Sequence, residues 1–208
     1  DRVWETTAEV LAISWSDAWP ETPRVCALTD ADQVTCSDDA GQTWTGTRAT
    51  PESLTDLAVS GDRTLWGAGL TGLWRVEGEE TWTRTSLEGA IRYTTLLSDG
   101  TLLAVRDEEA VWRSDDDGAT WSLCPEGLPE SLDGVGAPRD GIYYRQLVQE
   151  STGRVLLATW SGLYASDDGG LTWFARETEM PWTTRAIDLG WSSSGAPWAL
   201  IGKYGGGS

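Results

Sequence analysis

The stretch Ser37-Asp38-Asp39-Ala40-Gly41-Gln42-Thr43-Trp44 occurs in two further versions in the chain of 208 residues, at 114–121 and 166–173. All three follow the pattern Ser-x-Asp-x-Gly-x-Thr-Trp. Internal repetition of this kind means that each copy belongs to one supersecondary unit, which buries a core only by stacking on its neighbours. The pattern therefore predicts the fold more directly than the function. Its members are Ser37, Asp39, Gly41, Thr43, Trp44, Ser114, Asp116, Gly118, Thr120, Trp121, Ser166, Asp168, Gly170, Thr172 and Trp173.

The tryptophan that ends each copy gives the length of the repeat. Trp44, Trp82 and Trp121 are separated by 38 and 39 residues, and Trp173 follows after another 52. Each interval contains four short segments with alternating apolar positions and β-branched or aromatic residues, bounded by turn residues. The first repeat, for example, is predicted to form strands at 10–15, 24–29, 33–37 and 43–47. The outer strand of the third repeat is predicted at 120–123. A unit of about forty residues with four strands is typical of a β-propeller blade.

We therefore predict an all-β fold: a single five-bladed β-propeller of four-stranded antiparallel blades, in one domain over 1–208. Four blades are expected at about 8–48, 53–86, 89–124 and 140–178. The fifth would combine 183–208 with the N-terminal strand 1–7, which would pair with the C-terminal blade and close the ring. Closure removes exposed sheet edges. The alternative is a longer propeller of which this chain is a part, because the third strand of the last blade has only a glycine-rich tail to form it.

The composition excludes several kinds of function. The chain has no histidine, which removes Ser-His-Asp and Cys-His catalysis and histidine-containing zinc sites. The formal net charge is −18, and nucleic acids and anionic membranes both require a basic face, so neither is an expected partner. No run of about 18 apolar residues occurs, so membrane insertion is not expected. The start at Asp1 without methionine is what removal of a secretion signal would leave, so we expect an extracytoplasmic or secreted protein. We also expect a monomer.

Two of the three cysteines lie in a predicted hairpin. If Leu28 faces Val34 across it, Cys26 and Cys36 are directly opposed and could form a cross-strand disulfide. A register slip of one residue would instead leave two reduced, buried thiols. The residues leave both alternatives open.

The three motifs resemble the Asp-box, or BNR repeat, of sialidases, sortilin-type receptors, xyloglucan-degrading glycoside hydrolases and photosystem II assembly factors. The resemblance covers four of the five predicted blades and is strong in three. In that family the box lies on the turn between the third and fourth strands, away from the axial ligand site, which implies a structural role. Aspartate and serine hydrogen-bond the turn, glycine permits positive φ, and tryptophan packs between sheets. The acidic runs lack the spacing of calcium loops, so neither a metal nor a cofactor is expected.

Propeller ligands usually bind at the axial mouth, where loops from several blades meet. The loop 125–140 is an insertion that accounts for the longest interval, and long loops in compact domains tend to be functional. The loop 177–184 adds a tryptophan, and aromatic rings beside carboxylates suit stacking on sugars or capture of a cationic group. We expect a polar ligand to bind among Asp107, Glu108, Glu130, Asp133, Asp140, Trp160, Trp182 and Arg185.

Three functions fit these observations. The one we favour is a non-enzymatic binding propeller that recognises a glycan or a peptide or protein through its axial mouth. The alternative is an assembly or scaffold factor that binds a protein partner. A sialidase-like or other glycoside hydrolase fits less well. Phe174 is the sole phenylalanine, so the Phe-Arg-Ile-Pro segment typical of sialidases is missing, and xyloglucanase-like enzymes use a cleft between two propellers.

Overall fold

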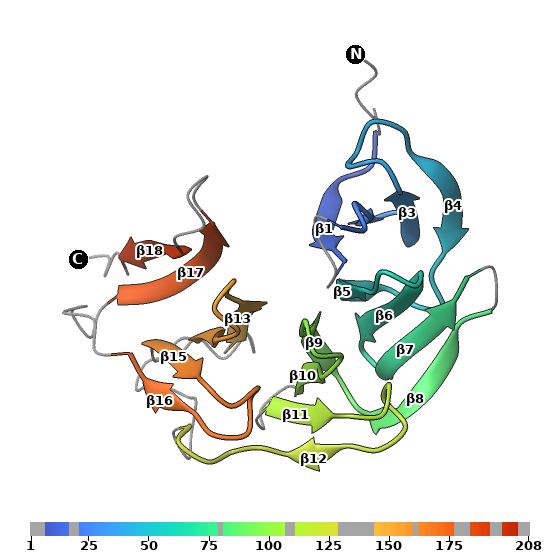
Figure 1. Cartoon of the computed structure of the whole chain (residues 1–208). Helices are drawn as coiled ribbons and strands as arrows, with labels where there is room; N and C mark the ends of the chain where they lie inside the picture. Colours follow the sequence, from blue (N-terminus) through green and yellow to red (C-terminus); the bar gives the residue numbers. More distant parts are fainter. Residues whose placement is uncertain are drawn as a thin grey trace, which may run out of the picture. The chain divides into compact units, whose positions relative to one another are not determined.

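The computed structural model of the chain describes residues 7–16, 21–78, 81–106, 111–128, 144–159, 162–176, 184–191 and 197–203. All regular structure in these ranges is β-strand. The strands form four antiparallel four-stranded sheets and one two-stranded sheet, each with its strands in the order of the chain (Figure 1). The prediction of an all-β protein built from four-stranded units is confirmed for these four sheets.

The strands fill one sheet after another along the chain. The first sheet contains β1 (Val10–Trp15), β2 (Val25–Thr29), β3 (Gln33–Ser37) and β4 (Thr45–Ala49). The second contains β5 (Leu54–Val59), β6 (Thr64–Gly69), β7 (Gly72–Glu77) and β8 (Thr83–Glu88). The third contains β9 (Ile91–Leu96), β10 (Leu102–Arg106), β11 (Val111–Ser114) and β12 (Ser122–Leu123). The fourth contains β13 (Tyr144–Gln149), β14 (Val155–Thr159), β15 (Gly162–Ser166) and β16 (Phe174–Ala175), and the last pair is β17 (Thr184–Trp191) and β18 (Pro197–Lys203).

The chain divides into two compact units. The first comprises 1–106 and 112–122, and the second comprises 107–111 and 123–208. The first unit holds the first two sheets and most of the third, and the second holds the fourth sheet and the β17–β18 pair. The single domain with its predicted blade boundaries stays a prediction.

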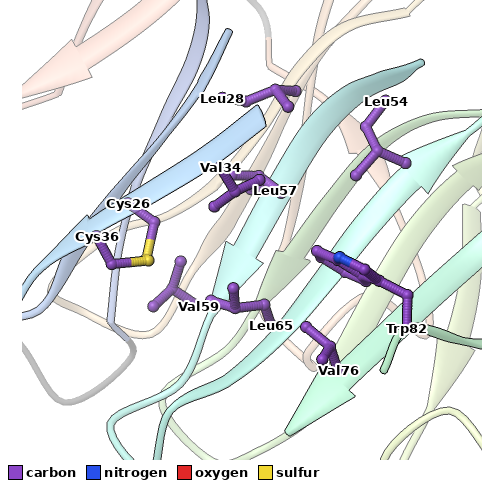
Figure 2. Close-up of a cluster of buried hydrophobic side chains, with 10 residues drawn as sticks. All are labelled: Cys26, Leu28, Val34, Cys36, Leu54, Leu57, Val59, Leu65, Val76 and Trp82. Carbon is purple, nitrogen blue, oxygen red and sulfur yellow. A yellow bond between two sulfur atoms is a disulfide. The ribbon is translucent and has the colours of Figure 1, made fainter. Parts of the chain in front are cut away.

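Side chains of the central strands alternate between two buried interfaces. One hydrophobic cluster lies between the first and second sheets (Figure 2) and a second joins the second and third sheets. Within β6, Leu65 belongs to the first cluster, and Trp66 and Ala68 belong to the second. Successive side chains of a strand point to opposite faces of its sheet, so a sheet covered on both faces buries every position. This explains why all six residues of β6 are buried.

The first strand of every sheet carries a β-bulge at an equivalent position. The register with the neighbouring strand skips one residue of each first strand; these residues are Leu11, Thr55, Arg92, Arg145 and Ile187. A bulge bends the strand and re-aims the side chains beside it. The β17–β18 pair therefore has the same register break as the first two strands of each complete sheet.

The hairpin of β2 and β3 carries a disulfide. Leu28 pairs with Val34 and Cys26 pairs with Cys36 in its register. A disulfide joins the two cysteines, whose Cα atoms are 4.1 Å apart, and both belong to the cluster in Figure 2. Of the two alternatives that the sequence left open, the structure has the disulfide.

The outer strands begin later than the sequence pattern suggested. Strand β4 starts at Thr45, not at Thr43, and β12 starts at Ser122, not at Thr120. The physical reason is that the threonine and tryptophan of the motif are still part of the turn, where hydrogen bonds to the motif aspartate hold the threonine.

Candidate functional site

The motif of residues 37–44 forms a turn that its own polar side chains hold together. The hydroxyl of Ser37 accepts a hydrogen bond from the Gly41 N–H at 2.8 Å and donates to Asp39 Oδ1 at 2.7 Å. The carboxylate of Asp39 accepts from the N–H of Thr43 at 2.7 Å and from its hydroxyl at 2.6 Å. Gly41 has a φ of 85°, a conformation that favours glycine. The turn thus uses both carboxylate oxygens for its own closure.

The other two copies repeat this geometry. Asp116 accepts from the N–H and hydroxyl of Thr120 at 2.8 and 2.6 Å, and Asp168 accepts from those of Thr172 at 2.9 and 2.6 Å. These bonds place the acidic runs on turns between the third and fourth strands of their sheets.

The same hydrogen bonds keep the motif aspartates ionised. Bonds from the side chain and backbone of Thr43, and then from Ser37, lower the pKa of Asp39 to about 2. Equivalent bonds from Thr120 and Ser114 lower the pKa of Asp116. For Asp168 burial is the largest influence and raises the pKa, yet the bonds from Thr172 and Ser166 together leave it below its usual value. A carboxyl group with a lowered pKa is a poor proton donor near neutral pH, so these residues are unsuited to general acid catalysis.

Replacing the buried serine of a motif is expected to cost stability. Ser114 is 2% exposed, and its hydroxyl accepts from the Gly118 N–H at 2.9 Å. Ser114→Ala leaves that buried N–H without a partner, so the free energy of unfolding should fall by about 2 kcal/mol. The measurement is the urea concentration at the midpoint of unfolding, and the dependence of the unfolding free energy on urea concentration should stay unchanged. The control is Ser53→Ala at an exposed position, where a change of less than about 0.5 kcal/mol is expected; an equal loss in both variants would contradict the role of the hydroxyl.

The third copy of the motif differs in the environment of its tryptophan. Trp44 and Trp121 donate from Nε1 to the carbonyl oxygens of Gly41 and Gly118, both at 3.1 Å. Trp173 Nε1 is buried and has no hydrogen-bond partner in the part of the chain that the structure describes. Its main-chain N–H instead donates to the Glu126 carbonyl oxygen at 2.9 Å. The start of the long insertion thus runs directly against the motif turn of the fourth sheet.

A second polar cluster joins the first strands of the second and third sheets. The Thr55 hydroxyl, at the bulge of β5, lies 3.2 Å from the Ile91 carbonyl oxygen and 3.0 Å from that of Arg92, both on β9. The next residue, Asp56, accepts a hydrogen bond from the Thr94 N–H at 3.0 Å. Burial raises the pKa of Asp56 to about 7, although hydrogen bonds from Thr94 and Leu57 act in the opposite direction. The bulge therefore aims two polar side chains of one sheet at the backbone of the next.

The sequence reasoning missed this joint between sheets. The available signal is the similarity of Thr55-Asp56-Leu57 to Ile187-Asp188-Leu189, which occupy matching positions at the bulges of β5 and β17. Both segments place an aspartate directly after the residue that is out of register. These aspartates lie outside the Ser-x-Asp-x-Gly-x-Thr-Trp motif, and the other first strands have no aspartate at the matching position.

The predicted ligand residues fall almost entirely outside the described part of the chain. Arg185 lies in β17, opposite Gly202 of β18. The other seven lie outside the described residues: Asp107, Glu108, Glu130, Asp133, Asp140, Trp160 and Trp182. Their gathering around an axial mouth stays a prediction.

Two further observations concern the described residues. They contain no group of three or more histidine, cysteine, aspartate or glutamate side chains placed to hold a metal ion. They also contain no helix of the length and apolar character needed to cross a membrane.

Comparison with known proteins identifies the fold. No family model matches the sequence, and no curated protein matches it. Among solved structures, the chain is similar to the GH74 xyloglucanase from Xanthomonas campestris, with a TM-score of 0.73 and 19% identity over 94% of this chain and 34% of that one. It is also similar to virginiamycin B lyase from Staphylococcus aureus (TM-score 0.68, 15% identity, 95% of this chain and 67% of that one). A third similar structure is YCF48 bound to D1 peptide (TM-score 0.61, 18% identity, 95% of this chain and 63% of that one).

These likenesses establish the architecture alone. The four-stranded antiparallel sheets and their structural relatives show that the chain has a β-propeller fold. The chain spans about a third of the xyloglucanase and just under two thirds of YCF48. The similar proteins include both glycoside hydrolases and YCF48, so the fold is compatible with catalysis and with binding.

Proposed function

We propose that this protein is a non-enzymatic binding propeller that recognises a peptide, protein or glycan through the loops at its axial mouth. The observation that carries the proposal is the closure of the motif turns, in which the repeated carboxylates bind their own threonine and serine neighbours. The aspartates that recur in all three motifs therefore have a structural role. Recognition then belongs to the loops that interrupt the repeat and to the strand residue Arg185 beside one of them. The loop residues that we propose are Asp107, Glu108, Glu130, Asp133, Asp140, Trp160 and Trp182.

A peptide or protein ligand has specific support. YCF48, one of the proteins of similar fold, has been solved with a D1 peptide bound. Binding of this kind would also fit the alternative role of an assembly or scaffold factor. We further propose that the three motifs are Asp-boxes, because each pairs a turn-closing aspartate with a tryptophan that directly precedes the outer strand.

We propose that the ring has five blades, the last formed by 183–208 and the N-terminal strand 1–7. Strand β1 leaves Leu11, Ile13 and Trp15 exposed by 48, 52 and 52%. Side chains of this size on an inner strand of a propeller normally pack against a neighbouring blade. The bulge that β17 shares with the other first strands supports its role as the start of that blade.

The experiment is a binding screen of the whole chain against a glycan array and a peptide array, followed by titration of the best ligand. Trp160→Ala and Trp182→Ala are each expected to weaken binding by roughly tenfold or more, because buried aromatic anchors dominate such sites. The control is Phe174→Ala, which removes a 43% exposed aromatic side chain from the outer strand β16. Unchanged affinity in both tryptophan variants would overturn this placement of the site. Release of reducing sugar from a bound oligosaccharide would overturn the non-enzymatic role.

A further inference from the structure

The hairpin between β6 and β7 has a leucine at its tip. Only two residues, Leu70 and Thr71, join the two strands. The side chain of Leu70 is 54% exposed, more than any other large apolar side chain that the structure describes. A single exposed leucine is common on protein surfaces, so its meaning depends on the residues that hold it in place.

The carboxylate of Glu52, in the connection between β4 and β5, holds this tip. Its Oε1 accepts hydrogen bonds from the N–H and the hydroxyl of Thr71, both at 3.0 Å, and from Trp74 Nε1 at 2.7 Å. Gly69 leaves room for the carboxylate, because a Cβ added there would collide with Oε1. Glu52, Thr71 and Trp74 form what we call the latch.

Neither turn formation nor core packing accounts for a leucine at this tip. Two-residue hairpins favour turns with positive φ at one or both residues, usually glycine, asparagine or aspartate. Leu70 and Thr71 both lie outside the left-handed region. The side chain of Leu70 belongs to neither of the two clusters that join the first three sheets. The latch thus holds in place a residue that contributes neither to the turn nor to those clusters.

The tip lies at the end of the second sheet where three connections of the first unit meet. Strand β7 begins at the tip and ends at the turn toward β8, so the tip is opposite the turn between the third and fourth strands. The connection between β4 and β5 reaches the tip through Glu52. The connection between β8 and β9 reaches it through the Gly89 N–H, which donates to the Thr71 carbonyl oxygen at 3.2 Å. In repeat folds such loops share one face, often the binding face.

In the fourth sheet, the same place in the sequence belongs to a tryptophan that we assign to the mouth. Strands β14 and β15 are also joined by two residues, of which the first is Trp160. Both hairpins pair without a register break, so Leu70 and Trp160 follow equivalent strand positions. The corresponding connection of the first sheet, 30–32, has three residues and no large apolar one. A large apolar residue at this place is therefore not a requirement of the repeat.

We propose that Leu70 is a further ligand-contacting residue of the axial mouth, that the latch positions it, and that the ligand is a basic peptide with an apolar side chain that packs on Leu70. This inference rests on the function proposed above. A leucine side chain offers neither a hydrogen bond nor a flat ring to a sugar, so it selects for an apolar group. The mouth residues proposed above include five carboxylates and one arginine, which favours a positively charged ligand.

The test uses two fluorescein-labelled peptides of equal charge, Lys-Leu-Lys-Leu-Lys-Leu-Lys and Lys-Ser-Lys-Ser-Lys-Ser-Lys, and fluorescence anisotropy with the whole chain. The leucine peptide should bind roughly tenfold more tightly than the serine peptide. Leu70→Ser should remove most of this preference and leave binding of the serine peptide within about twofold. Leu171→Ser is the matched control, because Leu171 is 48% exposed and lies in the motif turn of the fourth sheet; it should keep the full preference.

Three variants test the latch and leave Leu70 in place. Glu52→Ala removes the acceptor and should weaken binding of the leucine peptide by roughly fivefold. Glu52→Gln keeps a side-chain carbonyl oxygen and should restore the affinity to within about twofold of the parent chain. Gly69→Ala displaces the carboxylate and should resemble Glu52→Ala. The serine peptide should bind all three as it binds the parent chain, which a general loss of folded structure would prevent.

Four results would overturn the inference. The first is equal affinity of the parent chain for the two peptides. The second is an equal effect of Leu70→Ser and Leu171→Ser. The third is an equal loss in Glu52→Ala and Glu52→Gln, which would make Glu52 a charge contact and not a latch. The fourth is a glycan as the best ligand of the array screen, which would reject the peptide but keep the mouth.

The function proposed for the mouth fails in a different way. Loss of leucine-peptide binding in Trp160→Ala and Trp182→Ala, with none in Leu70→Ser, would keep the mouth and reject Leu70 and its latch. Unchanged binding in both tryptophan variants, with a loss in Leu70→Ser, would overturn the placement of the mouth and support the contact at Leu70.

Discussion

Gly127→Ala is expected to destabilise the second unit by roughly 4 kcal/mol, at the upper end of what single substitutions do. Gly127 has a φ of 84°, and a Cβ added to it would lie 1.6 Å from the Trp173 carbonyl oxygen and 2.6 Å from the carbonyl carbon. No rotamer relieves this contact, because the backbone alone fixes the position of Cβ. The two segments would have to separate, which would break the 2.9 Å hydrogen bond from the Trp173 N–H to the Glu126 carbonyl oxygen.

The control for this variant is Gly153→Ala. Gly153 also belongs to the second unit and has a φ of 89°, but an added Cβ would meet nothing within 4 Å. The Gly153→Ala variant should therefore lose only the stability that an alanine in the left-handed conformation costs, about 1–2 kcal/mol. Urea unfolding followed by tryptophan fluorescence measures both. Equal losses in the two variants would show that the close approach of Gly127 to Trp173 does not contribute to stability.

Asp56→Asn is expected to stabilise the protein above neutral pH, by roughly 2–4 kcal/mol. In the folded chain the pKa of Asp56 is raised to about 7 from an ordinary value of 3.8. Between these two pH values the folded state binds more protons than the unfolded state, so the contribution of this group to stability falls as pH rises. Asparagine carries no charge and keeps an oxygen that can accept the Thr94 N–H. The advantage of the variant should therefore grow from pH 4 to pH 7 and level off above.

The measurement is the difference in melting temperature between Asp56→Asn and the parent chain from pH 4 to pH 9. Removal of any carboxylate also relieves repulsion in a chain with a net charge of −18. Asp30→Asn controls for this, because Asp30 is exposed and the substitution changes the charge by the same amount. A stability difference that does not change with pH for Asp56→Asn, or one that matches the control, would contradict a raised pKa of the Asp56 carboxyl group at the joint.

Strand positions were predictable because they depend on local pattern. Strands 10–15 and 33–37 were predicted with the bounds that the structure has. The pairing of Cys26 with Cys36 depended on one assumption about the hairpin register, and that register is present. The starts of β4 and β12 were predicted too early, because apolar and β-branched patterns do not distinguish a strand from a turn that side-chain hydrogen bonds hold in place.

The candidate ligand residues were harder to predict for a physical reason. Loops at a propeller mouth come from different blades, and their side chains meet only through the stacking of whole sheets. Arg185 is the one member of the predicted set with a described backbone position.

The sequence by itself determined the repeat, the four-stranded units and the turn-closing role of the motif, since each depends on contacts between residues close in the chain. Tertiary structure alone decided which side chains lie between sheets. It placed Leu65 in one interface and Trp66 in the next, aimed Asp56 at the backbone of β9, and brought the Trp173 carbonyl against Gly127. Such contacts join residues tens of positions apart in the chain, and their geometry follows from the packing of one sheet on another. A local sequence pattern contains no information about that packing.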